Sequence, residues 1–161
     1  MSAEKLTDVL VKKIISTEIN FFVANFANAD MVGHTGNLTA GIQAVEFLDG
    51  CLKKIMDACL MADAALIITA DHGNIEQMIN PKTGDIDKDH TTNPVPFLLV
   101  ANELKFPKSL NRKYSFLSTR VPAGVISDIA PTVLELFGLP KPLEMTGVSL
   151  FTELDDVPRK R

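Results

Sequence analysis

The sequence is poor in several residue types that mark particular protein classes. Among its 161 residues there are no tryptophans, one tyrosine, two cysteines and three histidines. No apolar run approaches the ~20 residues that a membrane-spanning helix needs, so we expect no transmembrane segment and no membrane partner. Residues 1–13 contain no apolar signal core, which favours a cytoplasmic protein. The formal net charge of −4 argues against a nucleic-acid-binding surface.

The two cysteines are too far apart to form a disulfide with each other. Cys51 and Cys59 lie in one predicted helix, which separates them by about 12 Å along its axis. We expect both to be reduced thiols in the core. Common site motifs are also absent: there is no G-x-G-x-x-G, no P-loop, no G-x-S-x-G and no cysteine pair with zinc spacing. No serine or threonine has a spacing that marks it as a nucleophile.

Apolar periodicity divides the chain into alternating helices and strands. Continuous apolar, β-branched runs predict buried strands at 18–26, 64–70 and 95–101. Helical spacing predicts helices at 3–16, with Ser2 as N-cap, at 37–62, and at 128–138, with Asp128 as N-cap and Gly138 just after the end. We expect a polar loop at 27–36, an irregular excursion at 102–123, and a loop with an edge strand after residue 138.

Strands separated by helices predict an α/β fold with a mostly parallel sheet and helices on both faces. In such sheets ligands collect outside the carboxyl ends of the strands. Polar motifs follow the first two predicted strands, and a third precedes the last strand. The topology can therefore bring all of them into one crevice.

All the histidines lie in these polar motifs, and aspartates accompany them. Asp30 precedes His34 by four residues, Asp71 directly precedes His72, and His90 stands before the third strand. Carboxylate oxygen and imidazole nitrogen suit Zn²⁺, Mn²⁺ and Fe²⁺, so the set predicts a centre for one or two divalent ions. The neighbours Asp71 and His72 can share a site only if the strand has ended there.

Each of these residues also has a simpler interpretation. An aspartate and a histidine four residues apart are a weak signal on spacing alone. His72 could cap a helix that begins at Asn74, His90 could be a surface loop residue, and Asp71 could stabilise a turn. The metal hypothesis is favoured because five candidate ligands lie at the ends of three predicted strands.

Four segments together carry a family resemblance. NFANADMVGHTG, TADHGN, HTTNPVPF and DIAPTVLELFGLPKPLEMTGVSL closely resemble segments of the cofactor-independent (2,3-bisphosphoglycerate-independent) phosphoglycerate mutases, which belong to the alkaline phosphatase superfamily. The similarity runs from about Ser2 to Leu150. It implies an alkaline-phosphatase-like α/β domain, present here in part. It also implies an isomerase of glycolysis and gluconeogenesis that interconverts 3-phosphoglycerate and 2-phosphoglycerate through a phosphoserine.

The resemblance also implies a ligand assignment. One divalent ion would be held by Asp30, His34 and His90, and a second ion in part by Asp71 and His72. Mn²⁺ is the expected metal, with Mg²⁺, Co²⁺ or Zn²⁺ as alternatives. The second site is expected to be incomplete, because the aspartate that completes it lies near the N-terminus of the family's chain.

The family's chain is much longer than this one. Its nucleophilic serine and its substrate-gripping domain precede the region that resembles this chain, so no catalytic residue is expected here. We therefore expect residues 1–152 to be the C-terminal part of a metal-binding phosphatase-type domain and 153–161 to be a polar tail. A fragment of this kind should be inactive alone, and apolar surface exposed by truncation would favour self-association. The alternatives are a stand-alone metal-dependent phosphohydrolase and a non-catalytic module that completes a split enzyme.

Overall fold

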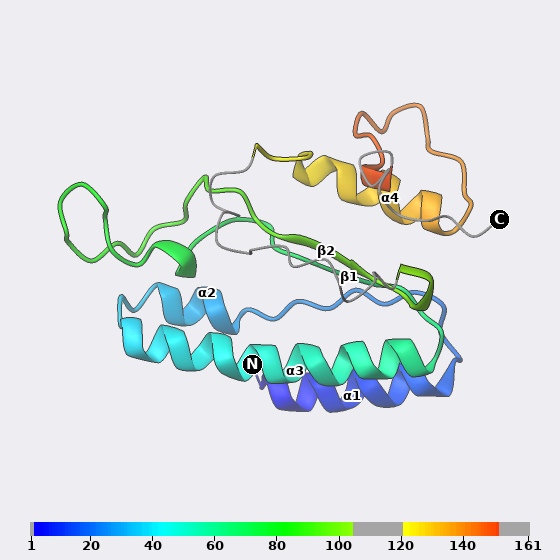
Figure 1. Cartoon of the computed structure of the whole chain (residues 1–161), viewed down its shortest axis with the longest axis horizontal. Coiled ribbons are helices and arrows are strands. Elements are labelled where there is room, and N and C mark those ends of the chain that lie inside the picture. The colour runs from blue at the N-terminus through cyan, green and yellow to red at the C-terminus, as the bar shows by residue number, and fades with distance from the viewer. Residues whose placement is uncertain (1, 105–120, 152–161) are drawn as a thin grey trace, which may run out of the picture. The chain divides into compact units, whose positions relative to one another are not determined.

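The computed structural model describes residues 2–104 and 121–151 (Figure 1). The chain forms two compact units, residues 1–102 and 103–161. No helix in the described ranges is long and apolar enough to cross a membrane. The predicted tail, 153–161, lies outside the described residues, so its boundary remains a prediction.

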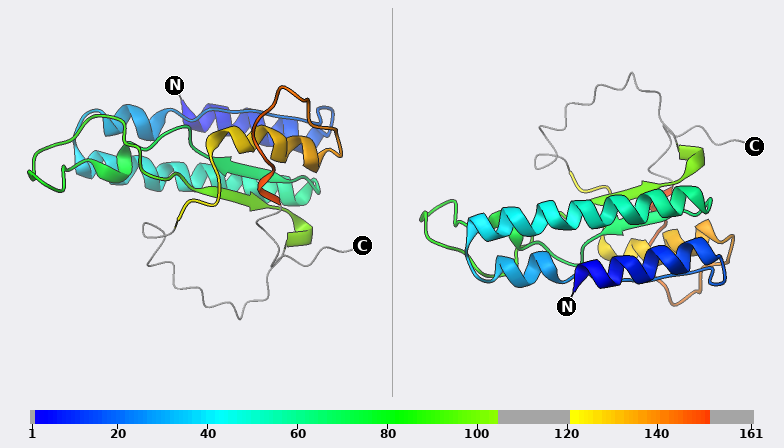
Figure 2. Two further views of the ribbon diagram at one scale, coloured as in Figure 1. Left: turned by 90° about the horizontal axis from the view of Figure 1, so that it is seen from above. Right: turned by 90° about the horizontal axis from the view of Figure 1, so that it is seen from below.

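Two long helices form one layer of the first unit. Helix α1 spans Ala3–Ser16, and the Ser2 hydroxyl accepts a hydrogen bond from the Lys5 amide at 3.4 Å, as predicted. Helix α3 spans Leu38–Met61, and Asn37 caps it through a 3.1 Å bond from the Ala40 amide. The two helices pack side by side (Figure 2). Both predicted helices are therefore confirmed.

The core of this unit lies where α1 and α3 meet. Ile14 of α1 packs with Ile55, Ala58 and Cys59 of α3, and all four are buried. Burial raises the pKa of the Cys59 thiol, which suits an uncharged core residue. Cys51 is also buried, and neither cysteine forms a disulfide.

A two-stranded sheet provides the second layer of this unit within the described residues. Strand β1 is Leu66–Thr69 and β2 is Phe97–Val100, which confirms two of the predicted strands and the α/β class. The predicted parallel direction is wrong for this pair, because the strands run antiparallel, with Leu66 opposite Val100 and Thr69 opposite Phe97.

The chain between the strands explains the antiparallel direction. A parallel pair needs a long crossover, usually a helix, that carries the chain back to the opposite end of the sheet. Here the excursion folds back on itself through isolated bridges between Gly73 and Thr91 and between Ile79 and Ile86. Its only regular helix is a short 3₁₀ turn at Ile75–Gln77. The chain therefore returns to the end of the sheet that it left.

The prediction of a strand at 18–26 is also wrong. These residues form no strand, and the chain bends at Asn20. Phe22 and Phe26 pack against the helical core, whereas Val23 is 82% exposed. The apolar run suggested burial on both faces, but only one side of the segment contacts the core.

In the second unit, a 3₁₀ turn at Ile126–Asp128 leads into helix α4, Ile129–Leu136. Asp128 is buried and begins the helix as predicted, but its side chain does not cap α4. Its carboxylate instead accepts hydrogen bonds from the amides of Val125 and Val148, both at 2.9 Å. Gly138 ends the helix with a φ of 65°, a conformation that favours glycine.

The remaining expectations for the C-terminal part have mixed outcomes. Residues 139–149 form a loop, and the predicted edge strand is not found among these described residues. Of the predicted excursion at 102–123, Asn102–Leu104 form a 3₁₀ turn. Residues 105–120 lie outside the described part of the chain.

Candidate metal centre

A short helix carries the first two predicted ligands. The sequence predicted a loop at 27–36, but Asn28–Gly33 form helix α2, which packs against α3. The His34 amide donates to the Asp30 carbonyl at 3.1 Å, so one helical turn separates the two residues and their side chains share one side of the helix. Asp30 Oδ1 and His34 Nε2 lie 3.3 Å apart.

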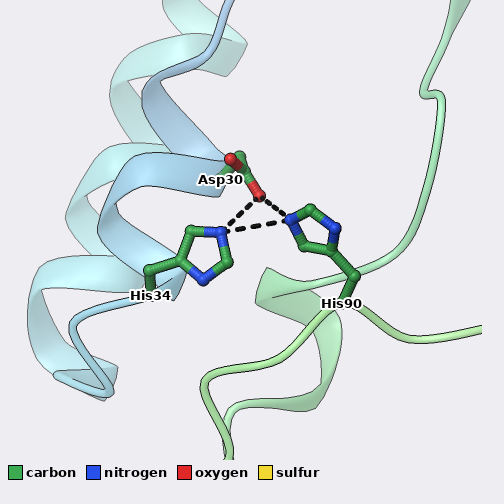
Figure 3. A group of neighbouring side chains, drawn as sticks. All are labelled: Asp30, His34 and His90. Atoms are coloured by element: carbon green, nitrogen blue, oxygen red, sulfur yellow. Dashed lines mark hydrogen bonds and ion pairs between the residues drawn. The ribbon is translucent and has the colours of Figure 1, made fainter.

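His90 completes the cluster from the loop that precedes β2. Its Nε2 lies 3.2 Å from Asp30 Oδ1 and 3.1 Å from His34 Nε2 (Figure 3). Because β1 and β2 are antiparallel, the end of β1 lies next to the start of β2. The antiparallel pairing thus brings the polar motifs of the two strands to the same end of the sheet, where α2 also lies (Figure 1).

The spacing of these three atoms fits a shared cation. Ligand atoms about 2.1 Å from one ion lie about 3.0 Å apart at octahedral angles and about 3.4 Å apart at tetrahedral angles. The observed separations of 3.1, 3.2 and 3.3 Å fall in that range. Asp30 Oδ1 is also buried without a hydrogen-bond partner, and a buried carboxylate oxygen is costly unless a cation or a donor meets it. The donor set therefore fits a divalent metal.

A backbone carbonyl sets the tautomer of His34. His34 Nδ1 lies 2.6 Å from the carbonyl oxygen of Lys88. In the neutral ring Nδ1 therefore carries the proton and donates it to this carbonyl, which leaves the lone pair of Nε2 directed at Asp30 and His90. Histidines that bind metals are commonly oriented in this way.

A glycine allows α2 to approach the turn after β1. Gly33 is buried, and a Cβ built on it would lie 1.6 Å from Asn74 Oδ1. Any larger residue would therefore force either α2 or the Asn74 side chain to shift. The same turn carries His72, so this close approach brings the first polar motif next to the second.

Asp71 and His72 lie beside the cluster rather than within it. They follow β1 after one intervening residue, and the His72 ring stacks on the His90 ring with centroids 3.6 Å apart and an interplanar angle of 20°. His72 Nδ1 is buried without a hydrogen-bond partner, whereas the Asp71 side chain is 80% exposed. In the described residues, only Asp30, His34 and His90 form a group of ligand atoms that could share one ion.

Sequence reasoning missed one charged residue at this site, Glu76. Its carboxylate accepts hydrogen bonds from the Asn74 amide at 2.6 Å, from Asn93 Nδ2 at 3.0 Å and from the Thr91 hydroxyl. Burial raises the pKa of Glu76, but the hydrogen bonds together outweigh burial and lower it below the usual range. No spacing rule identifies such a residue, because its partners are up to 17 positions away in the sequence.

Comparison with known families agrees with this geometry. Residues 1–141 match the family described as the Metalloenzyme superfamily. The chain belongs to this superfamily.

Within the superfamily, the chain is most similar in sequence to one kind of enzyme among the relatives compared. The chain is 49% identical over 151 residues to the 2,3-bisphosphoglycerate-independent phosphoglycerate mutase of Clostridium novyi, covering 94% of this chain and 27% of that protein. It is 45% identical over 153 residues to the enzyme of the same name from Clostridioides difficile, covering 95% and 28%. The family resemblance seen in the sequence is therefore confirmed, and the chain spans about a quarter of the length of the curated relatives it matches.

A solved structure gives the same relationship in three dimensions. A crystal structure of Leishmania mexicana phosphoglycerate mutase, determined at low cobalt concentration, superimposes with a TM-score of 0.71 and 28% sequence identity. The match covers 91% of this chain and 27% of that one. This neighbour has the alkaline-phosphatase-like fold, and the helices and small sheet of this chain are consistent with part of such an α/β domain.

Proposed function

We propose that this chain is the metal-ligand portion of a cofactor-independent phosphoglycerate mutase, an isomerase of glycolysis and gluconeogenesis that acts in the cytoplasm on 3-phosphoglycerate and 2-phosphoglycerate. The convergence of Asp30, His34 and His90 on one point carries the proposal. The similarity to the clostridial mutases over almost the whole chain supports it.

The proposed centre takes two divalent ions, with Mn²⁺ as the expected metal. Asp30, His34 and His90 would hold the first ion through one carboxylate oxygen and two imidazole nitrogens. Asp71 and His72 would provide part of a second site. Such ions, when bound, supply positive charge that neutralises phosphate oxygens and lowers the pKa of a hydroxyl nucleophile.

The residues of this chain would serve that chemistry by orientation. The Lys88 carbonyl keeps the proton of His34 on Nδ1, away from the ion. The His72 ring covers one face of His90 and limits its rotation. The 161 residues on their own are expected to supply metal ligands but not the nucleophile, so the isolated chain should not turn over phosphoglycerate.

A chimera tests this function. The matching 151 residues of the Clostridium novyi relative would be replaced by those of this chain, and mutase activity would be followed with a coupled enolase assay. The chimera should turn over 3-phosphoglycerate, and its Asp30→Asn variant should not, while the isolated chain should be inactive. A folded chimera without activity would contradict the proposal. Hydrolysis of p-nitrophenyl phosphate by the isolated chain, lost in Asp71→Ala, would favour a stand-alone phosphohydrolase instead.

Self-association is a separate part of the proposal. Val23 in the 18–26 segment and Met61 at the end of α3 are 82% and 78% exposed, so the chain presents apolar side chains to solvent. Exposed apolar surface of this kind favours association. Light scattering should show species larger than a monomer, and Val23→Ser should reduce their amount.

A further inference from the structure

Glu76 lies between the two loops that carry the histidines of the candidate centre. It belongs to the 3₁₀ turn that follows His72, and its hydrogen-bond donors include Thr91, the residue directly after His90. We propose that Glu76 is a positioning residue that holds the His90 loop against the Asp71–His72 turn and so sets the geometry of the metal ligands. This inference rests on the proposed metal function of Asp30, His34 and His90.

The contacts of Glu76 join the two loops directly. Its Oε1 accepts from the Thr91 hydroxyl and from Asn93 Nδ2, which lie on the His90 loop. Its Oε2 accepts from the Asn74 amide at 2.6 Å, which ties the carboxylate to its own turn. One backbone bond, from the Thr91 amide to the Gly73 carbonyl at 2.8 Å, runs parallel to these contacts. Asn93 Nδ2 also donates to Gln77 Oε1 at 3.3 Å. Glu76 is therefore the charged acceptor in a junction that one backbone pair and one amide pair also support.

The side chains of Thr91 and Glu76 pack tightly around Gly73. A Cβ built on Gly73 would lie 2.2 Å from Thr91 Oγ1 and 2.3 Å from Glu76 Oε1. The three groups thus close around a position that only glycine can occupy without a shift. Thr91, the residue directly after His90, is therefore packed closely against the backbone of Gly73, the residue directly after His72.

Glu76 is placed to orient a ligand rather than to be one. Its two oxygens already accept three hydrogen bonds, which uses most of the acceptor capacity of a carboxylate. Its partners are all donors on the two loops, and among the described residues the group that could share an ion does not include it. Loss of Glu76 would leave the Thr91 hydroxyl, the Asn93 amide and the Asn74 amide without this acceptor, and the His90 loop would lose its anchor.

Calorimetric titration of the full 161-residue chain with Mn²⁺ tests the proposal. Glu76→Ala should weaken Mn²⁺ binding by about 10-fold or more, the range seen when a residue that orients a metal ligand is removed. Glu76→Gln should bind with intermediate affinity, because its carbonyl can still accept from Thr91 and Asn93 but its amide opposes the Asn74 N–H. The matched control is Glu46→Ala, which removes an exposed glutamate from α3 and should leave the affinity unchanged.

A second pair of variants separates positioning from general stability. Thr91→Val removes the hydroxyl that bonds Glu76 and should weaken Mn²⁺ binding roughly 3- to 10-fold, whereas Thr91→Ser keeps the hydroxyl and should bind like the parent. The double variant Glu76→Ala/Thr91→Val should lose less affinity than the two single losses combined, since both remove the Glu76–Thr91 contact and only the bond from the Asn93 amide to the Thr91 hydroxyl is lost in addition. Thr91→Val and Thr91→Ser decide the question even if Glu76→Ala does not fold.

Hydrogen exchange provides a readout that does not depend on metal. The Thr91 amide, bonded to the Gly73 carbonyl, should exchange faster in Glu76→Ala than in the parent chain, while amides of α1 should not change. Unchanged Mn²⁺ affinity and unchanged Thr91 exchange in Glu76→Ala would overturn the inference. A parent chain that fails to bind Mn²⁺ would overturn the proposed metal centre, and Thr91 exchange alone would then decide whether Glu76 holds the loop.

Discussion

The His72 ring lies flat against the His90 ring, with centroids 3.6 Å apart. His90 directs its Nε2 toward Asp30 and His34, so its edge serves one proposed ion while its face is covered by a proposed ligand of the other. The two halves of the candidate centre are therefore in direct contact through the stacked rings of His72 and His90. Any change that turns the His90 ring should affect both halves.

The stacked ring gives the first prediction. His72→Ala should weaken Mn²⁺ binding at the Asp30–His34–His90 group by about 2- to 10-fold, the effect of losing an aromatic contact worth roughly 0.5–1.5 kcal/mol. His72→Phe keeps a flat ring without nitrogen ligands and should bind nearly as the parent does. Calorimetric titration measures both variants. Equal losses in the two variants would show that the nitrogen of His72, and not its ring surface, is needed.

The number of tight ions per chain gives the second prediction. After dialysis against Mn²⁺ and then against metal-free buffer, elemental analysis should find at most one ion per chain, because Asp71 and His72 offer only two ligands. Asp30→Asn or His34→Ala should remove this ion, and chelation by EDTA should do the same. Asp71→Asn is the matched control, since its exposed carboxylate lies outside the group and the ion should remain. Two tightly held ions would contradict the incomplete second site.

Local patterns predicted the helices and two strands because each of these elements is determined by its own residues. The cap Ser2 and the apolar spacing of the two long helices are local signals that tertiary contacts do not override. The apolar runs at 64–70 and 95–101 likewise form β1 and β2.

The features that were missed depend on contacts distant in the sequence. The strand direction depends on bridges such as Gly73 to Thr91, which no apolar pattern encodes. Helix α2 is only six residues long, so its sequence contains little helical periodicity, and its Gly33 packs against Asn74, which is distant in the sequence. The ligand types and the family could be predicted from motifs, whereas the contacts of Glu76 required the fold that brings the two loops together.

The buried Asp128 gives a prediction about acid stability. Hydrogen bonds from the amides of Val125 and Val148 hold the pKa of this carboxyl below its usual range, and the charge of Lys141 lowers it further. A carboxyl whose pKa is lower in the folded state stabilises the fold fully above its unfolded pKa, and this contribution is lost as the pH falls through the folded pKa. Asp128→Asn should therefore be less stable than the parent at neutral pH.

The difference in stability between Asp128→Asn and the parent should become smaller as the pH falls below about 4, near the ordinary pKa of an aspartate. Thermal unfolding followed by circular dichroism across this pH range measures it. The control Asp49→Asn, at an exposed position of α3, should follow the parent at every pH. A difference for Asp128→Asn that does not change with pH would mean that the charge of this carboxylate does not contribute to stability.

Gly33 gives the last prediction, which separates the position of α2 from the ligands that α2 carries. Gly33→Ala places a methyl group 1.6 Å from Asn74 Oδ1. Because Asn74 is buried and its side chain has little room to turn aside, we expect α2 to move away from the turn that follows β1. Asp30 and His34 would move with it, while His90 stays with its own loop, and Mn²⁺ affinity should fall by about 10-fold or more although every proposed ligand is retained.

Gly50→Ala is the matched control, because a Cβ at Gly50 meets no atom within 4 Å. Since Gly50 lies inside α3, this control should raise helix stability by about 0.5–1 kcal/mol and leave metal binding unchanged. Wild-type affinity in Gly33→Ala would show that α2 does not need its close approach to Asn74.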